Sequence, residues 1–176
     1  MADATDLANK CVMTERLIIE PLRPAHARIL FFPLQAAHLY RFVSGQPPTS
    51  VTTLTEQYRR WATRPDLALN YLLHHRDLDI PIGTLRAMHM GDGRSLLTCQ
   101  TFSQFTRCGY SREAASVLTH LLADAGLAVE AMVDTRNRPA QALLAALGFI
   151  RIGRIDEADW ISGAPSNEYH YTYPRP

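Results

Sequence analysis

Residues 106–114 read Thr-Arg-Cys-Gly-Tyr-Ser-Arg-Glu-Ala and connect a β-like run, Leu96 to Phe102, to a helix-like run, Arg112 to Ala125. Backbone N–H groups in the first turn of a helix lack intrahelical partners and carry the positive end of the helix dipole, so they stabilise an anion. Gly109 allows the loop backbone to approach a bound group closely. The junction therefore predicts a phosphate site made of main-chain amides, and a helix start that happens to contain glycine is the simpler alternative.

A second strand–loop–helix unit follows in the chain. Val129 to Asp134 is predicted as a strand, and Asn137 opens a helix that stops at Gly148-Phe149. Asparagine caps helices in proteins of every function, so Asn137 is expected either to cap this helix or to bond a ligand. The two units together predict one cofactor held between neighbouring strand ends and helix starts.

The length and composition are those of one globular domain. The 176 residues are 47% apolar and 20% charged, and a chain of this length buries roughly 70% of the surface that its unfolded form exposes. We expect residues 1–12 to form a flexible N-terminal tail and residues 13–176 to form a single domain. The net charge of +1 argues against strong nucleic-acid binding through a basic surface.

Cysteine spacing and hydropathy indicate the cellular compartment of the protein. Cys11, Cys99 and Cys108 are odd in number and widely spaced, with no C-x-x-C pair and no histidine at ligand spacing. Neither a disulfide framework nor a metal site is therefore predicted. The first residues lack the apolar core of a signal peptide, and no run approaches ~18 apolar residues. We expect a cytoplasmic protein that does not contact membranes, and both a monomer and a homodimer stay open.

The remaining elements are predicted from periodicity, caps and turn residues. Strands are expected at residues 16–22, 70–75, 81–90, 95–102, 149–155 and 169–173, and helices at 24–34 and 50–64. A polar segment separates the last two strands. With the two central units, this order predicts an α/β fold with a mixed, mostly antiparallel sheet of about seven strands flanked by about four helices.

Four motifs in this order make the chain resemble the GNAT acetyltransferase superfamily, and in particular its Rim-type branch, whose namesakes acetylate the N-termini of ribosomal proteins. The family signature for the acyl-CoA pyrophosphate, Gln/Arg-x-x-Gly-x-Gly/Ala, falls on residues 106–111. Thr106 stands in place of Gln, Arg or Trp, and Ser111 in place of Gly or Ala. The Rim-type pattern Gly-Tyr-x-x-Glu-Ala fits residues 109–114 closely.

The other motifs of the resemblance lie on either side. Residues 14–19, Thr-Glu-Arg-Leu-Ile-Ile, are similar to the Rim-type first strand. The later family motif Asn-x-x-Ser falls on Asn137 and Ala140, so serine is replaced by alanine, and the Gly-Phe that follows its helix falls on Gly148-Phe149. The resemblance covers about residues 13–173, nearly the whole chain.

The resemblance implies acetyl-CoA as cosubstrate. In the family the two central strands splay, and the pantetheine arm fills the gap by bonding strand backbone, which here would be that of residues 101–103. A main-chain N–H there would also stabilise the oxyanion that forms when an amine attacks the thioester. The implied cofactor contacts are Thr101, Phe102, Ser103, Thr106, Arg107, Cys108, Gly109, Tyr110, Ser111, Arg112, Asn137 and Ala140.

The familiar acid and base of the family are missing or moved in this chain. The place of the family's tyrosine acid is Leu144, and the place of its strand glutamate falls at Leu96 and Leu97. The remaining catalytic candidates are Glu130, Glu113 and Ser103. Glu113 is also favourable near a helix N-terminus for dipole reasons alone, and strand alternation directs Glu130 towards either an acceptor cleft or solvent.

The sequence therefore predicts an N-acetyltransferase that transfers an acetyl group from acetyl-CoA to a primary amine, such as a protein N-terminus. An α-amino group is about 10% neutral at pH 7, whereas a lysine amine is almost wholly protonated, so an N-terminus asks less of a catalyst without a strong base. A small amine (a polyamine, an amino acid or an antibiotic) is the alternative acceptor, and a non-catalytic acyl-CoA-binding module is the alternative outside enzymes. The acceptor side is expected at residues 33–57 and 156–167.

Overall fold

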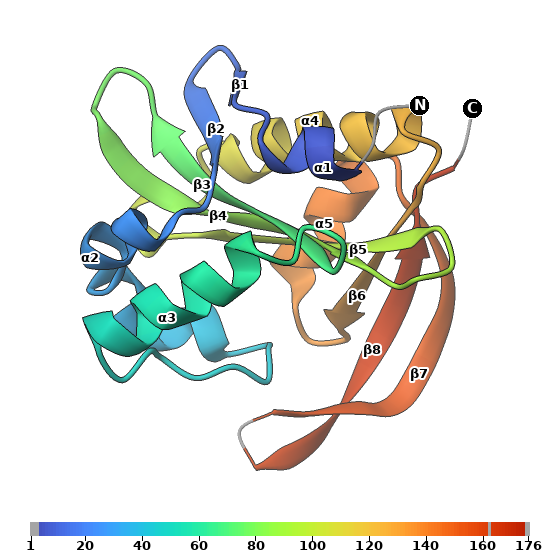
Figure 1. Ribbon diagram of the computed structural model, residues 1–176. Coiled ribbons are helices and arrows are strands. Elements are labelled where there is room, and N and C mark those ends of the chain that lie inside the picture. Colours follow the sequence, from blue (N-terminus) through green and yellow to red (C-terminus); the bar gives the residue numbers. More distant parts are fainter. Residues whose placement is uncertain (1–3, 162, 175–176) are drawn as a thin grey trace.

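The computed structural model describes residues 4–161 and 163–174, which form one open sheet with helices on both faces (Figure 1). The strands in these residues are β1 (Val12–Met13), β2 (Leu17–Pro21), β3 (Ala68–His75), β4 (Ile80–His89), β5 (Arg94–Thr101), β6 (Ala128–Asp134), β7 (Ile150–Ile161) and β8 (Ala164–Thr172). The α-helices are α1 (Ala4–Ala8), α2 (Ala27–Leu30), α3 (Val51–Ala62), α4 (Tyr110–Asp124) and α5 (Arg138–Ala146). The short 3₁₀ helices are η1 (Pro24–His26), η2 (Pro33–Gln35), η3 (Ala37–Tyr40) and η4 (Ser103–Phe105). The predicted fold class is confirmed, with β1 and α1 added to it.

The strand order is β1-β2-β3-β4-β5-β6-β8-β7, and every pair in the described sheet is antiparallel except β5 with β6. The parallel pair extends only from Arg94↔Ala128 to Leu96↔Glu130, and beyond it the two strands separate. Parallel neighbours need a crossover connection, which α4 supplies. The two strands therefore form a fork, closed near Leu96 and open towards their carboxyl ends.

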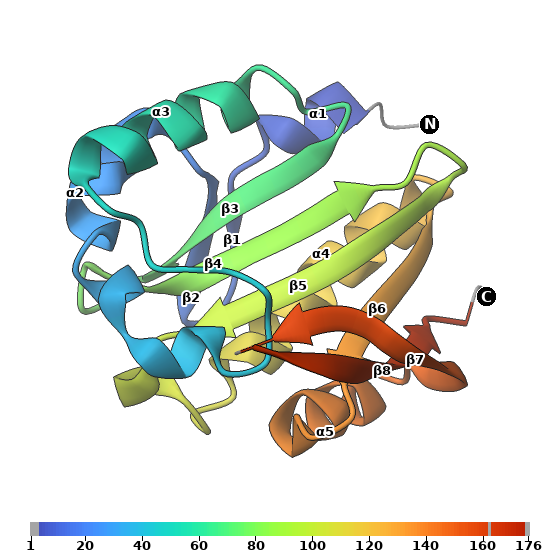
Figure 2. The same ribbon diagram turned by 90° about the horizontal axis from the view of Figure 1, so that it is seen from below.

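Each face of the sheet has its own core. On the first face, called the α4 face, α4 and α5 pack on the sheet, with Leu118 and Leu122 of α4 buried against Val129 of β6. On the second face, called the α3 face, α2, α3 and the 3₁₀ helices cover one part of the sheet, where Leu54 packs with Leu72. Figure 2 shows that α2 and α3 lie away from β7 and β8, and that the chain leading from η3 to α3 approaches the β7–β8 hairpin.

Capping and turn chemistry explain the helices that the sequence predicted. Ser50 caps α3, because its Oγ accepts from the backbone N–H of Thr53 at 3.0 Å, as expected for a serine at this position. The helix expected at residues 24–34 is instead divided into η1, α2 and η2. Pro33 lacks an N–H and starts the second short 3₁₀ turn, so one continuous helix does not form. None of the helices in the described residues combines the length and apolar character needed to cross a membrane.

Two predicted segments have more structure than expected. Residues 1–3 of the predicted tail lie outside the described residues, but α1 follows them, and the side chain of Leu7 is buried in the α4-face core. The Tyr71 hydroxyl donates to the carbonyl oxygen of Leu7 at 2.6 Å, so residues 4–12 are attached to the sheet and do not form a free tail.

The polar segment before the last strand is part of a long β7–β8 hairpin. Edge strands tolerate polar residues on both faces, which hides them from alternation patterns.

Candidate active site

The backbone of β5 presents hydrogen-bonding groups to the open part of the fork. Two bonds fix the phase of the β4–β5 ladder: the Phe102 N–H donates to the Ile82 carbonyl at 2.8 Å, and the Met90 N–H donates to the Arg94 carbonyl at 2.9 Å. Even-numbered residues of β5 therefore bond to β4, and odd-numbered residues direct their N–H and C=O groups towards β6. Beyond the last β5–β6 pair, these odd-numbered residues are Leu97, Cys99 and Thr101.

The alternation of backbone direction along β5 corrects the backbone contacts that the sequence predicted for the pantetheine arm. Of the expected Thr101, Phe102 and Ser103, only Thr101 belongs to the part of β5 that faces the fork, because the Phe102 N–H is already bonded to β4 and Ser103 begins η4. The Phe102 side chain is buried in the α3-face core. Cys99 was missed, although counting residues backwards along the strand would have found it. On the other side of the fork, Met132 directs its backbone inwards, since the neighbouring odd-numbered residues of β6 bond to β8.

The glycine loop after β5 ends in an uncapped helix start. Gly109 is the N-cap of α4 with φ +85°, and it has no side chain with which to cap the first-turn amides. Arg107 also has a positive φ, +62°, which a non-glycine residue rarely adopts. The N–H groups of Tyr110, Ser111 and Arg112 therefore receive no side-chain cap from Gly109, and the helix dipole favours an anion beside them. These features fit a pyrophosphate held by backbone.

The predicted side chains of this loop have different surroundings. The Thr106 hydroxyl donates to the Ser103 carbonyl at 2.8 Å and so closes η4. Arg107, Cys108 and Arg112 are exposed, and either arginine can reach an anion at the helix start without losing an ion pair that the described residues provide. The Cys108 thiol donates only a long bond, 3.4 Å, to the Thr106 carbonyl.

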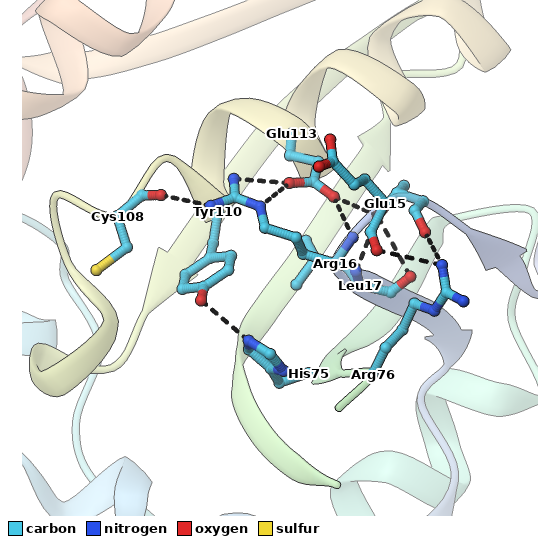
Figure 3. Close-up of polar contacts among 9 residues, drawn as sticks. Glu15, Arg16, Leu17, His75, Arg76, Cys108, Tyr110 and Glu113 are labelled. Carbon is cyan, nitrogen blue, oxygen red and sulfur yellow. Dashed lines mark hydrogen bonds and ion pairs between the residues drawn. The ribbon is translucent and has the colours of Figure 1, made fainter. Parts of the chain in front are cut away.

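Glu113, a predicted catalytic candidate, is instead part of a clamp behind the loop (Figure 3). Its carboxylate accepts from the Thr14 hydroxyl at 2.5 Å and the Arg16 backbone N–H at 3.0 Å, and it pairs with the Arg16 guanidinium at 2.7 Å. Arg16 also donates to the Cys108 carbonyl at 2.9 Å and lies over the Tyr110 ring, 4.5 Å from its centroid. Although partial burial opposes it, the bonds from Thr14 and Arg16 lower the pKa of Glu113. The clamp engages both carboxylate oxygens of Glu113, which favours the structural reading of this residue over the catalytic one.

Tyr110 and Ser111 attach the start of α4 to the sheet. His75 Nδ1 accepts from the backbone N–H groups of Asp77 and Leu78, so its Nε2 carries the proton and donates to the Tyr110 hydroxyl at 3.0 Å. The Ser111 hydroxyl shares a short hydrogen bond with the Thr101 hydroxyl. This bond gives a structural reason for serine where the family has Gly or Ala.

The half-buried Cys99 thiol lies beside the hydroxyls of Ser111 and Thr101. Burial raises the pKa of this thiol to about 11, and hydrogen bonds from the two hydroxyls oppose the shift only in part. A thiol with so high a pKa stays protonated at neutral pH. Cys99 therefore offers its backbone to the fork and keeps an unreactive side chain on the α4 face.

The second helix start, that of α5, is capped, unlike the start of α4. The Asn137 Oδ1 accepts from the Ala140 N–H at 3.2 Å, which satisfies the capping alternative and leaves the Nδ2 group for a ligand. Ala140 packs on the α4-face core, and Leu144 is buried in it. No acid can act from position 144. The end of β6 is held by Asp134, whose buried carboxylate accepts from Arg136 and, at 2.6 Å, from Ser166.

Glu130, the other carboxylate candidate, lies at the closed end of the fork. Its Oε2 is 2.9 Å from Nε2 of His170 on β8 and 3.3 Å from Nη1 of Arg94 on β5. The Glu130 side chain is 9% exposed and the His170 side chain 20% exposed. Sequence reasoning missed His170, because the pair spans 40 residues and depends on the β6–β8 register.

The two segments predicted for the acceptor side lie together around a hollow of about 670 Å³. Its lining comes from η3 and the following loop on one side and from the hairpin tip on the other; Ser162 lies outside the described residues. The described lining residues are Ala37, His38, Tyr40, Arg41, Val43, Ser44, Gly45, Gln46, Pro47, Trp160 and Gly163. The hollow opens on the α3 face, where Gln100 of β5 donates to the Leu39 carbonyl at 3.1 Å.

Solved structures of acetyltransferases have this fold. A ribosomal-protein-S5-alanine acetyltransferase from Vibrio fischeri superposes with a TM-score of 0.85 at 17% sequence identity, over 94% of this chain and 97% of that one. A ribosomal L7/L12 α-N-protein acetyltransferase in complex with coenzyme A gives 0.85 at 14% identity, over 93% and 97%. A chimera of the spermidine N-acetyltransferase from Vibrio cholerae gives 0.79 at 15% identity, over 90% and 95%. At these identities the likeness establishes the fold.

The sequence itself was also compared with known families. The search of curated proteins finds no match. A family model described as an acetyltransferase (GNAT) domain matches residues 16–150, which is more than half of the chain and includes both branches of the fork, the glycine loop and the Asn137 helix start. The chain therefore belongs to the GNAT acetyltransferase family.

Proposed function

We propose that this GNAT acetyltransferase transfers an acetyl group from acetyl-CoA to the α-amino group at the N-terminus of a peptide or protein. Acetyl-CoA, as the cosubstrate of the family, supplies the acetyl group as an activated thioester. The backbone of Cys99 and Thr101 would bond the pantetheine arm along the fork, and the first-turn amides of α4 would bind the pyrophosphate. The Cys99 N–H would donate to the carbonyl oxygen of the acetyl thioester, which gains negative charge when the amine attacks.

The side chains that line the hollow favour a peptide over a polyamine as the acceptor. The lining contains the basic or polar side chains of His38, Arg41 and Gln46 and the aromatic side chains of Tyr40 and Trp160, and no carboxylate is among the described lining residues. A polyamine site needs negative charge to stabilise several ammonium groups. A peptide instead presents carbonyl and carboxylate oxygens, which arginine and histidine can bind.

Amine chemistry and the structural relatives support the same acceptor. A terminal α-amine has a far larger neutral fraction at pH 7 than a lysine amine, so it reacts with less help from a base. Two of the similar structures, at a TM-score of 0.85, are named as ribosomal-protein acetyltransferases, and each superposes along almost its whole length.

A small cationic amine is the second candidate, favoured by one observation. Glu168 of β8 has a raised pKa, caused by burial first and then by the negative charges of Asp159 and Asp134. A polycationic acceptor would relieve this repulsion, and a similar structure is named as a spermidine N-acetyltransferase.

The proposal also includes a cytoplasmic location for the protein. The described cysteines are all free thiols, as in a reducing compartment.

The test is release of CoA thiol from acetyl-CoA with a panel of acceptors. The panel contains a peptide with a free N-terminus, the same peptide blocked at its N-terminus but carrying a lysine, and spermidine. We expect the free N-terminus to react fastest at pH 7 and the gap to the lysine peptide to narrow towards pH ~10, as the lysine amine loses its proton. Faster turnover of spermidine would establish the small-amine alternative. CoA binding without thiol release from any acceptor would indicate a non-catalytic module.

A further inference from the structure

The pair formed by Glu130 and His170 lies beside the point at which the fork opens. Continuing the fork's register past Leu96↔Glu130 places Met132 level with Thr98, next to Cys99. Met132 in turn pairs with His170 of β8. It is a non-hydrogen-bonded pair, in which the two Cα atoms are about 4.5 Å apart and the side chains share one face. His170 therefore lies one strand away from the point at which the fork opens.

The side chains concerned project from the α3 face, the same face as the acceptor hollow. Leu97 and Val129 point into the α4-face core, so strand alternation directs Thr98, Glu130 and Met132 to the opposite face. The amine would approach on this face, while the pyrophosphate site lies at the start of α4. An imidazole on the acceptor side of the fork can take a proton from the amine without blocking the cofactor.

The hydrogen bonds also select the tautomer of His170. The Glu130 carboxylate is paired with the Arg94 guanidinium and acts as an acceptor, so the His170 Nε2 must carry the hydrogen in their 2.9 Å bond. The lone pair of a neutral imidazole then lies on Nδ1. A carboxylate that fixes one ring nitrogen as a donor leaves the other to act as a base, which is the arrangement in nucleophile–histidine–carboxylate sites.

We propose that His170 is the general base of the acetyl transfer and that Glu130 is the residue that positions it; this inference rests on the proposed function. As the amine nitrogen bonds to the acetyl carbon, the amine proton passes to Nδ1 of His170. The carbon–sulfur bond then breaks, and the sulfur leaves as the thiolate of CoA. His170 returns its proton to solvent, and the catalyst is unchanged. Glu130, a catalytic candidate from the sequence, acts through the imidazole.

Charged groups reach His170 from three sides. Glu130 on β6 contacts the ring, Arg94 on β5 pairs with Glu130, and Glu168 lies two residues earlier on the same face of β8. On β7 the residue opposite His170 is Gly153, which adds no charge. Glu130 is therefore the charged partner that contacts the ring directly in the described structure.

The first test compares His170→Gln with a matched exposed histidine, His120→Gln on α4. With the best acceptor of the panel, we expect His170→Gln to lower kcat at least ~100-fold, as for loss of a positioned base, and to remove the fall of kcat/KM at low pH. The affinity for CoA, measured by calorimetry, should change less than twofold. His120→Gln should leave kcat, the pH profile and CoA affinity unchanged.

Glu130→Gln supplies a second test that a folding defect in the first variant cannot obscure. We expect kcat to fall ~10-fold to ~100-fold and the low-pH limb to move, because the amide no longer fixes the tautomer. In ¹⁵N–¹H spectra without acetyl-CoA, His170 of the wild type should carry its proton on Nε2, and Glu130→Gln should mix the two tautomers. If the wild type is active and folded His170→Gln is equally active, the assignment of His170 as the base is refuted, but the proposed function is not. A wild type that binds CoA but acetylates no amine overturns the proposed function as well.

Discussion

The two sides of the fork that we assign to the cofactor and to the acceptor differ in how they are held. The glycine loop has two residues at positive φ, and the clamp of Thr14, Arg16 and Glu113 supports it with a network of short polar contacts. The acceptor hollow is lined by an irregular loop and by the tip of an exposed hairpin. A strained loop keeps its shape only where its surroundings determine it. We infer that the cofactor grip is formed before acetyl-CoA arrives, whereas the acceptor surface is free to adapt.

The largest expected effect comes from a bulky substitution in the glycine loop, which tests whether this loop is a preformed phosphate site. In Gly109→Val, a β-branched residue must adopt a φ of +85°, and its Cβ would lie 3.3 Å from Nη2 of Arg16. We expect acetyl-CoA to bind at least ~10-fold more weakly, a loss of at least ~1.4 kcal/mol, in calorimetric titrations. Gly91→Val is the control, because Gly91 has a φ of +78° in open space at the other end of β5. Unchanged affinity in a folded Gly109→Val protein would refute the phosphate site.

Removing the clamp tests whether the loop needs its support. Arg16→Gln deletes the ion pair with Glu113 and the bond to the Cys108 carbonyl. We expect acetyl-CoA affinity to fall ~5-fold, about 1 kcal/mol, since the loop must then be ordered by the ligand. Arg64→Gln is a matched control: the exposed Arg64 also loses an ion pair, with Asp66 at 2.9 Å, but this pair lies before β3 and contacts no residue of the clamp. Equal affinities for the two variants would mean that the loop keeps its shape without the clamp.

Local signals made much of the cofactor side predictable from sequence. The glycine loop, the helix after it and the Asn137 cap depend on residues close together in the chain, so their types alone indicate the structure. The clamp was not predictable, because Arg16 and Glu113 are 97 residues apart and meet only when β2 lies beside α4. Glu113 therefore had two interpretations from the sequence, and the contacts of the clamp favour the structural one.

The acceptor side was less predictable for two physical reasons. The β7–β8 hairpin is an edge of the sheet with charged and exposed residues, so it lacks the alternation by which buried strands are recognised. The backbone direction of Cys99 and the pairing of Glu130 with His170 depend on ladder phase and register, and a shift of one residue would reverse both. No short motif encodes either.

A milder change tests how the acceptor side is anchored. Asp134 ties β6 to β8 through Ser166, and its bonds from Arg136, with that from Ser166, lower its pKa to about 2. Because this pKa lies below the unfolded value of about 3.9, the stabilisation is present at neutral pH and is lost as the pH falls from about 4 to about 2. Asp134→Asn should therefore lower the free energy of unfolding by about 1 kcal/mol at pH 7.

Urea titrations at pH 7 and pH 3 measure this contribution, and the difference between wild type and variant should shrink at the lower pH. The KM for the acceptor should rise in Asp134→Asn, while acetyl-CoA affinity stays within twofold of the wild type. A loss of CoA affinity as large as that of Arg16→Gln would show that the two sides of the fork are not independent.

The smallest expected effect concerns Ser111, where the chain departs from its family's signature. Its hydroxyl bonds to the Thr101 hydroxyl at the end of β5, so the side chain is turned towards the sheet and away from the exposed helix start. Ser111→Ala should lower the free energy of unfolding by about 0.5 kcal/mol, the low end for a neutral hydrogen bond. Its acetyl-CoA affinity should change less than twofold, because the backbone N–H remains. Ser116→Ala, farther along α4, controls for the general effect of alanine in this helix. A tenfold loss of affinity in Ser111→Ala would instead place the hydroxyl on the phosphates, and the cofactor grip would then include a side chain as well as backbone.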